Sequence, residues 1–417
     1  MSSLQANCPS WATANSEVQT LLQYARNPRI PNPRKKASDA PLHVAFTVTQ
    51  AMKDGRWSIG QLHNLQVVVL SLLFETPGPI VFHVVTTAPW FVLLENWFAE
   101  LLHGQSVFEA VCFRLYCVDL DEISKVLASI DVTAPAGLYS RALLPEILPS
   151  SVDEVLYLDT DQFVVSDLRV LWQTPLQGHA IGITGSPPTN KDDATSACSC
   201  IMKLDLKELR MLNHQSAQGQ GSASPWRTAV ENTLKAFVEG KRLAGQSKPV
   251  HVPFIEQFVF SQVGNSFGKL FFIEEQWNVF MCENANRNWH SALARHKWFG
   301  AVHFNCMEQS LEYGKFGLIT SDNGVLNTGS PKVISPEQRQ TEASYFPIFS
   351  FYSLLPLHCL RSAPEHVLSL QERQAGISGL PDPMGTQTRP PHTQARGDDS
   401  SYCAREPVSK CAPQPLG

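Results

Sequence analysis

The feature that most constrains this 417-residue chain is a short apolar run that stops at two carboxylates. Residues Val155 to Leu158 predict a strand that is buried on both faces, near the centre of a sheet. Asp159 and Asp161 follow this run directly, with Thr160 between them. In an open α/β sheet the ligand crevice lies beyond the carboxyl ends of the strands, so both carboxylates are expected to open into it.

Two carboxylates this close repel each other, and one would be driven into its protonated form unless a cation lay between them. A hard divalent ion with oxygen ligands and bound phosphates would resolve that repulsion. The alternative interpretation is an ordinary strand end, because acidic residues are common in turns and an isolated Asp-x-Asp is a weak motif. Just downstream, Ser166 or Asp167 is placed to cap a short helix that runs to Trp172.

Strands and helices alternate in the first part of the chain. Strands are predicted at residues 42–49, 79–86 and 111–118, and helices at 58–74 and 90–102. Such alternation implies right-handed crossovers and a mostly parallel, Rossmann-like sheet flanked by helices, which is an α/β fold. The chain has no Gly-x-Gly-x-x-Gly, so a dinucleotide-binding version of this fold is not expected.

The chain is expected to have three parts. Residues 1–40 are a polar lead and linker, with a short helix predicted near residues 18–26. Residues 41–361 are predicted to form the α/β domain, which ends with a closing helix after Ser335. Residues 362–417 are dominated by Pro, Gly, Ser and Gln, and a disordered tail is expected there.

Composition excludes several partners. A net charge of −5 gives no basic footprint for nucleic acid. The longest apolar stretch, Leu65 to Phe74, is far shorter than the roughly 20 residues that a membrane span needs, so no span is expected. The amino terminus shows no basic-then-apolar signal region.

The ten cysteines have poor spacing for metal binding. Cys198-Ser199-Cys200 has no second cysteine pair nearby, and a zinc site is therefore not expected. Buried free thiols are the preferred interpretation, with disulfides left open for an oxidising compartment. A second acidic pair, Asp119 and Asp121, is interpreted as turn chemistry.

The segment Tyr139 to Pro149, read together with the strand and its Asp-x-Asp, resembles the family 8 retaining glycosyltransferases, which have the GT-A fold. Xylosyltransferase-type and LARGE-like members look most similar, and the resemblance extends over about residues 42–360. It implies transfer of a sugar (xylose, glucose or similar) from a UDP-sugar to an acceptor hydroxyl, with Mn²⁺ or another divalent cation. The acceptor would be a glycan, a glycoprotein or a small molecule. Relatives are commonly Golgi or secretory-lumen proteins, but no anchor is visible here, so the cytoplasm stays open.

The resemblance also assigns site residues. Asp159, Asp161 and His303 would hold the metal, and imidazole with two carboxylates is a sound Mn²⁺ set. Gln257 and Glu256 would lie beside the anomeric carbon on the helix that starts there, as catalytic residues. Residues placed against the donor or acceptor are Thr47, Val48, Thr49, Arg141, Asp159, Thr160, Asp161, Ser199, Trp277, Asn278 and Lys315.

Two of these assignments carry a structural expectation. Arg141 lies on a helix predicted at residues 137–148 and is expected to reach phosphate oxygens. Trp277 and Asn278 resemble a strand near the acceptor side, although Trp277 is equally well explained as a core residue.

The chain departs from the family pattern close to the sugar and phosphates. Cys198-Ser199-Cys200 stands where members usually have Asn-Ser/Thr-Gly, Phe258 replaces a common Asp, and Glu308 replaces a lysine that Lys315 could only partly substitute. A catalytically impaired protein that binds nucleotide-sugar or glycan is therefore kept as an alternative. A phosphatase with Asp159 as nucleophile is disfavoured, because Phe163 stands where such enzymes have Thr or Val.

Overall fold

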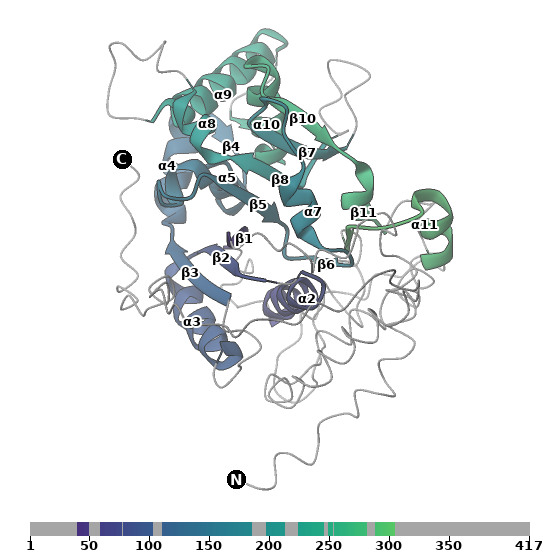
Figure 1. The fold of residues 1–417 in the computed structure, drawn as a ribbon. Coiled ribbons are helices and arrows are strands. Elements are labelled where there is room, and N and C mark those ends of the chain that lie inside the picture. Colours follow the sequence, from purple (N-terminus) through teal and green to yellow (C-terminus); the bar gives the residue numbers. More distant parts are fainter. Residues whose placement is uncertain are drawn as a thin grey trace, which may run out of the picture.

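A computed structural model of the chain describes residues 40–49, 59–76, 78–102, 111–185, 197–212, 224–245, 249–252, 254–281 and 288–304. Their centre is a seven-stranded sheet made of β1 (Leu42–Val48), β2 (Ile80–Thr86), β3 (Val111–Cys117), β5 (Glu154–Leu158), β7 (Ile181–Gly185), β8 (Ala197–Asp205) and β10 (Leu270–Ile273). The strand order is β10-β7-β8-β5-β1-β2-β3 (Figure 1). Only β8 runs antiparallel to its neighbours in this sheet, so the predicted α/β class with a mostly parallel sheet is confirmed.

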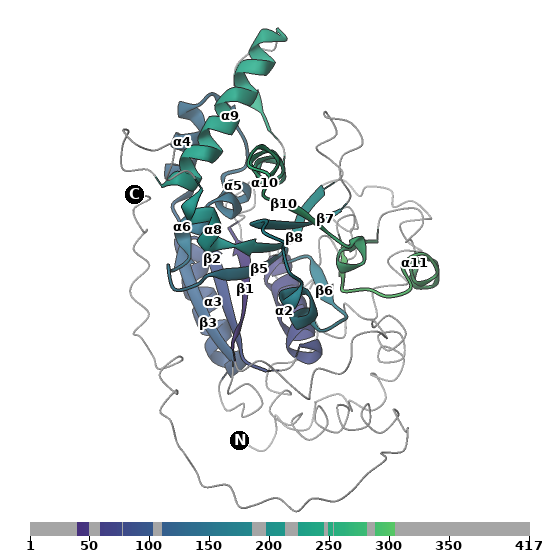
Figure 2. The same ribbon diagram turned by 45° about the horizontal axis from the view of Figure 1, so that its top comes forward.

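Helices cover both faces of the sheet because side chains alternate along each strand. On β5, Leu156 and Leu158 join one apolar core, whereas Val155 and Tyr157 join the other. The first core is closed by α2 (Ile59–Glu75), α3 (Ala88–Leu102), α7 (Leu168–Gln173) and α11 (Trp289–His296). The second is closed by α4 (Leu120–Ser129), α5 (Ala136–Ala142), α6 (Leu144–Ile147), α8 (Leu206–Met211), α9 (Pro225–Leu243) and α10 (Ile255–Ser266) (Figure 2). The layers are therefore helix, sheet, helix.

A small second sheet crosses the end of β5. Its strands are β11 (Val279–Phe280), β12 (Ala301–His303) and β6 (Gln162–Val164), in the order β11-β12-β6. Antiparallel pairing of β12 with β6 sets His303 opposite Gln162, one residue beyond Asp161. This pairing brings the far end of the described chain to the acidic pair. A separate two-stranded ribbon joins β4 (Val132–Thr133) to β9 (Val250–His251).

Side-chain caps start α4 and α7, and the predicted cap at Asp167 is confirmed. Asp167 begins α7, where its side chain accepts a hydrogen bond from the backbone N–H of Arg169 at 2.9 Å. Asp119 begins α4 and accepts from the backbone N–H groups of Asp121 and Glu122. The second acidic pair thus lies in the turn between β3 and α4, as predicted, and Asp119 also caps a helix that was not predicted.

Two predicted elements are wrong in detail. The single helix expected over residues 137–148 is split into α5 and α6, because Pro145 has no N–H to donate to the carbonyl of Arg141. The strand expected at Trp277 and Asn278 is instead a 3-10 turn over Glu275–Trp277, followed by the short β11.

Several predictions lie outside the described residues: the helix near residues 18–26, the closing helix after Ser335, the tail from 362 to 417, Glu308 and Lys315. Among the helices that the structure describes, none combines the length and the apolar character needed to cross a bilayer.

Candidate metal centre

Both aspartates after β5 are held by backbone hydrogen bonds. The N–H of Asp159 donates to the carbonyl of Cys200 at 2.9 Å, which extends the pairing of β5 with β8. The carbonyl of Asp161 accepts from the N–H of Phe304 at 2.9 Å, beside the pairing of β6 with β12. Asp159 is buried and Asp161 is half-buried, so the doublet is positioned by two different sheets.

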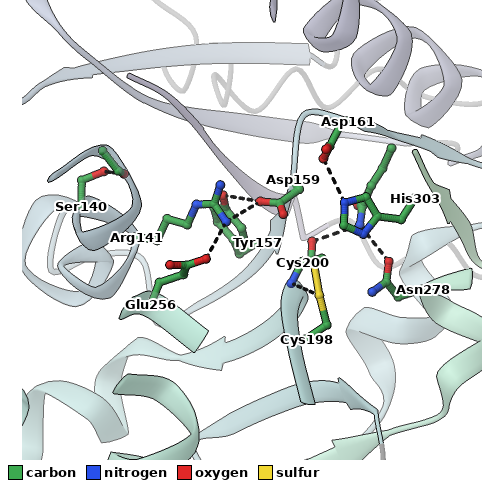
Figure 3. Close-up of polar contacts among 12 residues, drawn as sticks. Ser140, Arg141, Tyr157, Asp159, Asp161, Cys198, Cys200, Glu256, Asn278 and His303 are labelled. Atoms are coloured by element: carbon green, nitrogen blue, oxygen red, sulfur yellow. Dashed lines mark hydrogen bonds and ion pairs between the residues drawn. A yellow bond between two sulfur atoms is a disulfide. The ribbon is translucent and has the colours of Figure 1, made fainter. Parts of the chain in front are cut away.

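Asp159, Asp161 and His303 converge on one point. One ligand atom from each lies within 4.8 Å of the others, and Nε2 of His303 lies 3.2 Å from Oδ1 of Asp161 (Figure 3). Ligand atoms that each stand about 2.0–2.6 Å from one ion can be at most about 5 Å apart, so the spacing fits a single cation. Two carboxylate oxygens and one imidazole nitrogen are donors that suit Mn²⁺. The predicted set is brought together, and its role as a metal site remains a prediction.

Arg141 reaches this centre from α5. Its Nη1 lies 2.8 Å from Oδ1 of Asp159 and donates to Oε1 of Glu256 at 3.3 Å. The hydroxyl of Tyr157 donates to the same Asp159 oxygen at 2.9 Å, and the guanidinium lies 5.4 Å from the Tyr157 ring centroid. Figure 3 shows Arg141 between the two carboxylates. The arginine that was expected to meet donor phosphates is therefore engaged by the protein's own acids.

Burial dominates the electrostatics of this group. It raises the pKa of Asp159 above its ordinary value despite the attraction of Arg141, and Asp161 adds repulsion in the same direction. Burial likewise raises the pKa of Glu256, against the opposing effect of Arg141. Burial by itself would lower the pKa of Arg141. The attraction of Asp159 and of the other acidic groups around it outweighs burial and holds the pKa of Arg141 above its ordinary value. Three carboxylates, those of Asp159, Asp161 and Glu256, lie around the single guanidinium of Arg141. A further cation would reduce the repulsion among them.

The start of α10 places the two predicted catalytic residues differently. Glu256 is buried against Arg141, and burial raises its pKa although Arg141 and a hydrogen bond from the Ser199 side chain act in the opposite direction. Gln257 is half-buried. Phe258, which departs from the family pattern, packs against Phe237 of α9 with the rings tilted and their centroids 4.4 Å apart. That substitution therefore contributes to helix packing.

Three more of the predicted residues lie at the end of β1, and Thr160 lies between the two aspartates. Val48 and Thr49 are buried at the end of β1, with Thr47 and Thr160 half-buried. Gly137 of α5 packs so closely on Thr49 that a Cβ there would collide with the Thr49 hydroxyl. The amino end of α5 thus lies directly against the end of β1.

Trp277 and Asn278 have separate roles in packing and hydrogen bonding. Trp277 is buried against Gly300 and contacts Trp298 edge-on, with ring centroids 5.3 Å apart, as the core interpretation predicts. The side chain of Asn278 accepts a hydrogen bond from Gln162 at 3.0 Å, and Gln162 also donates to the carbonyl of Cys200 at 3.2 Å.

Sequence reasoning missed Tyr157 and Gln162. Tyr157 was read as part of an apolar strand, but it stands two residues before Asp159 and therefore on the same face. That alternation was the available signal. Gln162 gave no signal, because its partners come from β8 and from the segment before β11.

The prediction of free thiols is wrong for Cys198 and Cys200, which form a disulfide beside the acidic pair (Figure 3). Their Cα atoms are 5.2 Å apart, which is within the range that a disulfide spans. In a regular strand the Cα atoms of residues i and i+2 are about 6.6 Å apart. The shorter Cα–Cα distance between Cys198 and Cys200 therefore requires an irregular strand.

The middle of the chain is similar to known proteins. Residues 133–210, which include Arg141, both aspartates and Ser199, match the model of "Glycosyl transferase family 8", and the resemblance to that family is confirmed. Probable galacturonosyltransferase-like 4 of Arabidopsis thaliana is 30% identical over 145 residues, which is 34% of this chain and 37% of that protein. Glycosyltransferase 8 domain-containing protein 1 of Xenopus tropicalis is 31% identical over 124 residues, covering 29% and 32% of the two chains.

These matches span only about a third of each relative's length. Among solved structures, apo mouse xyloside xylosyltransferase 1 aligns with a TM-score of 0.45 and 15% identity, covering 64% of this chain and 98% of that one. The galactosyltransferase LgtC, in complex with donor and acceptor sugar analogs, aligns with a TM-score of 0.41 and 16% identity, covering 63% and 87%.

Proposed function

Starting from a chain related to the family 8 glycosyltransferases, with residues 133–210 carrying that family's pattern, we propose that the protein is a metal-dependent transferase of the GT-A type. It would move a sugar from a UDP-sugar to an acceptor hydroxyl with retention of configuration. The observation that carries the proposal is the convergence of Asp159, Asp161 and His303 at the carboxyl end of β5. That is where ligands bind in open α/β sheets.

In this proposal the two aspartates and His303 hold Mn²⁺ or a similar divalent ion. When bound, the ion would neutralise charge on the diphosphate leaving group as a Lewis acid. His303 is buried, and Nδ1 of its ring has no hydrogen-bond partner among the described residues. The imidazole is therefore fixed by packing and strand pairing, which keeps Nε2 beside Asp161.

Arg141 is assigned first to the two carboxylates it contacts. By pairing with Asp159 and Glu256 it would keep both ionised and oriented, because a charge-assisted hydrogen bond favours the charged form. We therefore propose Arg141 as a positioning residue, and a contact with donor phosphate remains a prediction.

Gln257 is proposed to face the sugar near its anomeric carbon. Glu256 is proposed to support the site indirectly, by holding Arg141 in place. The family resemblance implies attack from the front face, with the departing phosphate taking the acceptor's proton. This scheme requires no protein nucleophile and no general base. Glu256 is buried in contact with Arg141, which suits a supporting role better than attack on the sugar.

The donor is proposed to be a UDP-pentose or a UDP-hexose. The name of the Arabidopsis relative adds UDP-galacturonic acid to the xylose and glucose donors already considered. The acceptor would be a glycan, a glycoprotein or a small molecule. A secretory lumen is the proposed compartment, since disulfides such as Cys198–Cys200 persist in oxidising surroundings.

The test is hydrolysis and transfer across a panel of UDP-sugars with Mn²⁺, comparing the native chain with Asp161→Asn. Removal of one ligand should lower the rate by on the order of 10²-fold while the chain stays folded. Asp121→Asn is the matched control, because Asp121 belongs to the exposed acidic pair at the start of α4 and should have no effect.

Two outcomes would contradict the proposal. A UDP affinity that is indifferent to Mn²⁺ would remove the metal centre from it. Equal background rates in the native chain and in Asp161→Asn, with Mn²⁺-dependent UDP binding intact, would leave a nucleotide-sugar binding protein without turnover.

A further inference from the structure

Strand β8 carries an irregularity beside the candidate metal centre. Ile183 of β7 pairs with Met202, whereas the next residue, Thr184, pairs with Cys198. Residues 199–201 of β8 therefore have no partner on β7 and form a bulge. Alternate residues of a strand face the same side, and at this bulge the Cα atoms of Cys198 and Cys200 are only 5.2 Å apart, so their sulfur atoms meet.

A third ligand-type side chain faces these sulfurs. The two Sγ atoms and a ring nitrogen of His303 all lie within 4.8 Å of one another, and all three residues are buried. Nδ1 of His303 is a buried polar atom with no hydrogen-bond partner among the described residues. Burying an imidazole nitrogen without a hydrogen-bond partner costs free energy, unless a proton acceptor or a metal ion binds to it.

We propose that Cys198 and Cys200, once reduced, form with His303 a site for a soft divalent cation of the zinc class. Two thiolates and one imidazole are a common zinc set, with a fourth position left for a carboxylate or water. Thiolate ligands select zinc-class ions, whereas the carboxylates of Asp159 and Asp161 suit Mn²⁺. Because both sets include His303, a zinc-class ion on the thiolates would lie next to the Mn²⁺ site, where two divalent cations would repel each other.

While the disulfide is intact, the two sulfur atoms cannot bind a metal ion as thiolates. A dithiol reductant would make both thiols available. Reduction breaks the bond between the two Sγ atoms, and the reductant supplies two electrons and two protons while it forms a disulfide of its own. Zinc binding then displaces both thiol protons, because the thiolate is the metal ligand. The redox state of one cysteine pair thereby decides which cation the centre takes.

The thiol site does not depend on the transferase assignment, but its effect on Mn²⁺ rests on the proposed function. In the disulfide form only the oxygen and imidazole set is available, so the centre would accept Mn²⁺. In the dithiol form with zinc bound, repulsion from the neighbouring cation would weaken Mn²⁺ binding at the acidic pair.

The experiment measures metal binding by the full chain, without any sugar nucleotide. Co²⁺ serves as a spectroscopic probe, because thiolate ligands give it strong near-ultraviolet charge-transfer absorption, and Zn²⁺ affinity is measured against a chromophoric chelator. The native chain, Cys200→Ser and the control Cys112→Ser are each compared before and after reduction with dithiothreitol. Cys112 lies on β3, and its replacement changes the thiol count equally.

Reduced native protein should bind one more equivalent of Zn²⁺ tightly than reduced Cys200→Ser, whose affinity at this site should fall by on the order of 10²-fold or more. Cys112→Ser should match the native chain, and oxidised protein should show no thiolate band from this site. Zn²⁺ should also displace Mn²⁺ from the reduced native chain.

Equal binding by the native chain and Cys200→Ser would overturn the proposal. So would failure of dithiothreitol to release the Cys198 and Cys200 thiols, counted by alkylation and mass spectrometry. If the zinc results are as expected but Mn²⁺ has no effect on UDP binding, the thiol site stands and the transferase proposal fails.

Discussion

The contact of Arg141 with two buried carboxylates makes a quantitative stability prediction. Replacing it with Met keeps a side chain of similar length but removes the guanidinium that both Asp159 and Glu256 contact, at 2.8 and 3.3 Å. Asp159 is 7% exposed and Glu256 is 3% exposed, so water cannot replace the lost partner. Breaking a buried ion pair from one side costs about 3–5 kcal/mol.

That cost can be followed by thermal and urea unfolding in buffer with a chelator. For a domain of this size a loss of 3–5 kcal/mol lowers Tm by roughly 10 °C. The matched control is Arg242→Met, because Arg242 pairs with Glu239 on the exposed side of α9. Exposed pairs contribute little, and the control should leave Tm almost unchanged.

A second substitution tests the electrostatic origin of the loss. In the Arg141→Met background, Glu256→Gln removes one of the two uncompensated charges and should recover on the order of 1–2 kcal/mol. In the native background the same change should destabilise, because it removes a partner of Arg141.

The reasoning is refuted if Arg141→Met costs no more than Arg242→Met. It is also refuted if Glu256→Gln destabilises both backgrounds equally, because the loss would then come from packing and not from uncompensated charge.

Three further predictions follow from other contacts. His303→Gln should weaken Mn²⁺ binding by roughly 10–100-fold in calorimetry, and an unchanged Kd would exclude His303 as a ligand. Burial lowers the pKa of His83 from 6.5 to about 3, so its contribution to stability is full above pH 6.5. Below that pH the unfolded chain takes up a proton that the folded one refuses, so stability should fall by up to about 1.4 kcal/mol per pH unit, and His83→Gln should flatten this slope in urea titrations. Gly300→Ala drives a Cβ into the Trp277 ring and should cost about 1–3 kcal/mol, whereas Gly240→Ala, with open space around it in α9, should raise Tm.

The sequence by itself determined the local parts of this protein. The apolar run before Asp159 predicted a buried central strand, and the alternation of strands and helices predicted a mostly parallel sheet. Asp167 identified the start of α7 correctly. These features depend on residues that are neighbours along the chain, so side-chain periodicity and capping chemistry are sufficient to predict them.

The tertiary structure decided which side chains meet. His303 was assigned beside the acidic pair only through family resemblance, and it is the pairing of β12 with β6 that brings it there. The partners of Arg141 lie 18 and 115 positions away along the chain, and no local pattern encodes them.

The cysteine pair shows the same division most clearly. The sequence favoured buried free thiols and left disulfides open, and in a regular strand the Cα atoms of residues i and i+2 are held about 6.6 Å apart. The bulge in β8 removed that restriction, and its position was set by the register with β7, more than ten residues away in sequence. Registers and bulges arise from the simultaneous packing of several strands, which is why only the folded chain could reveal them.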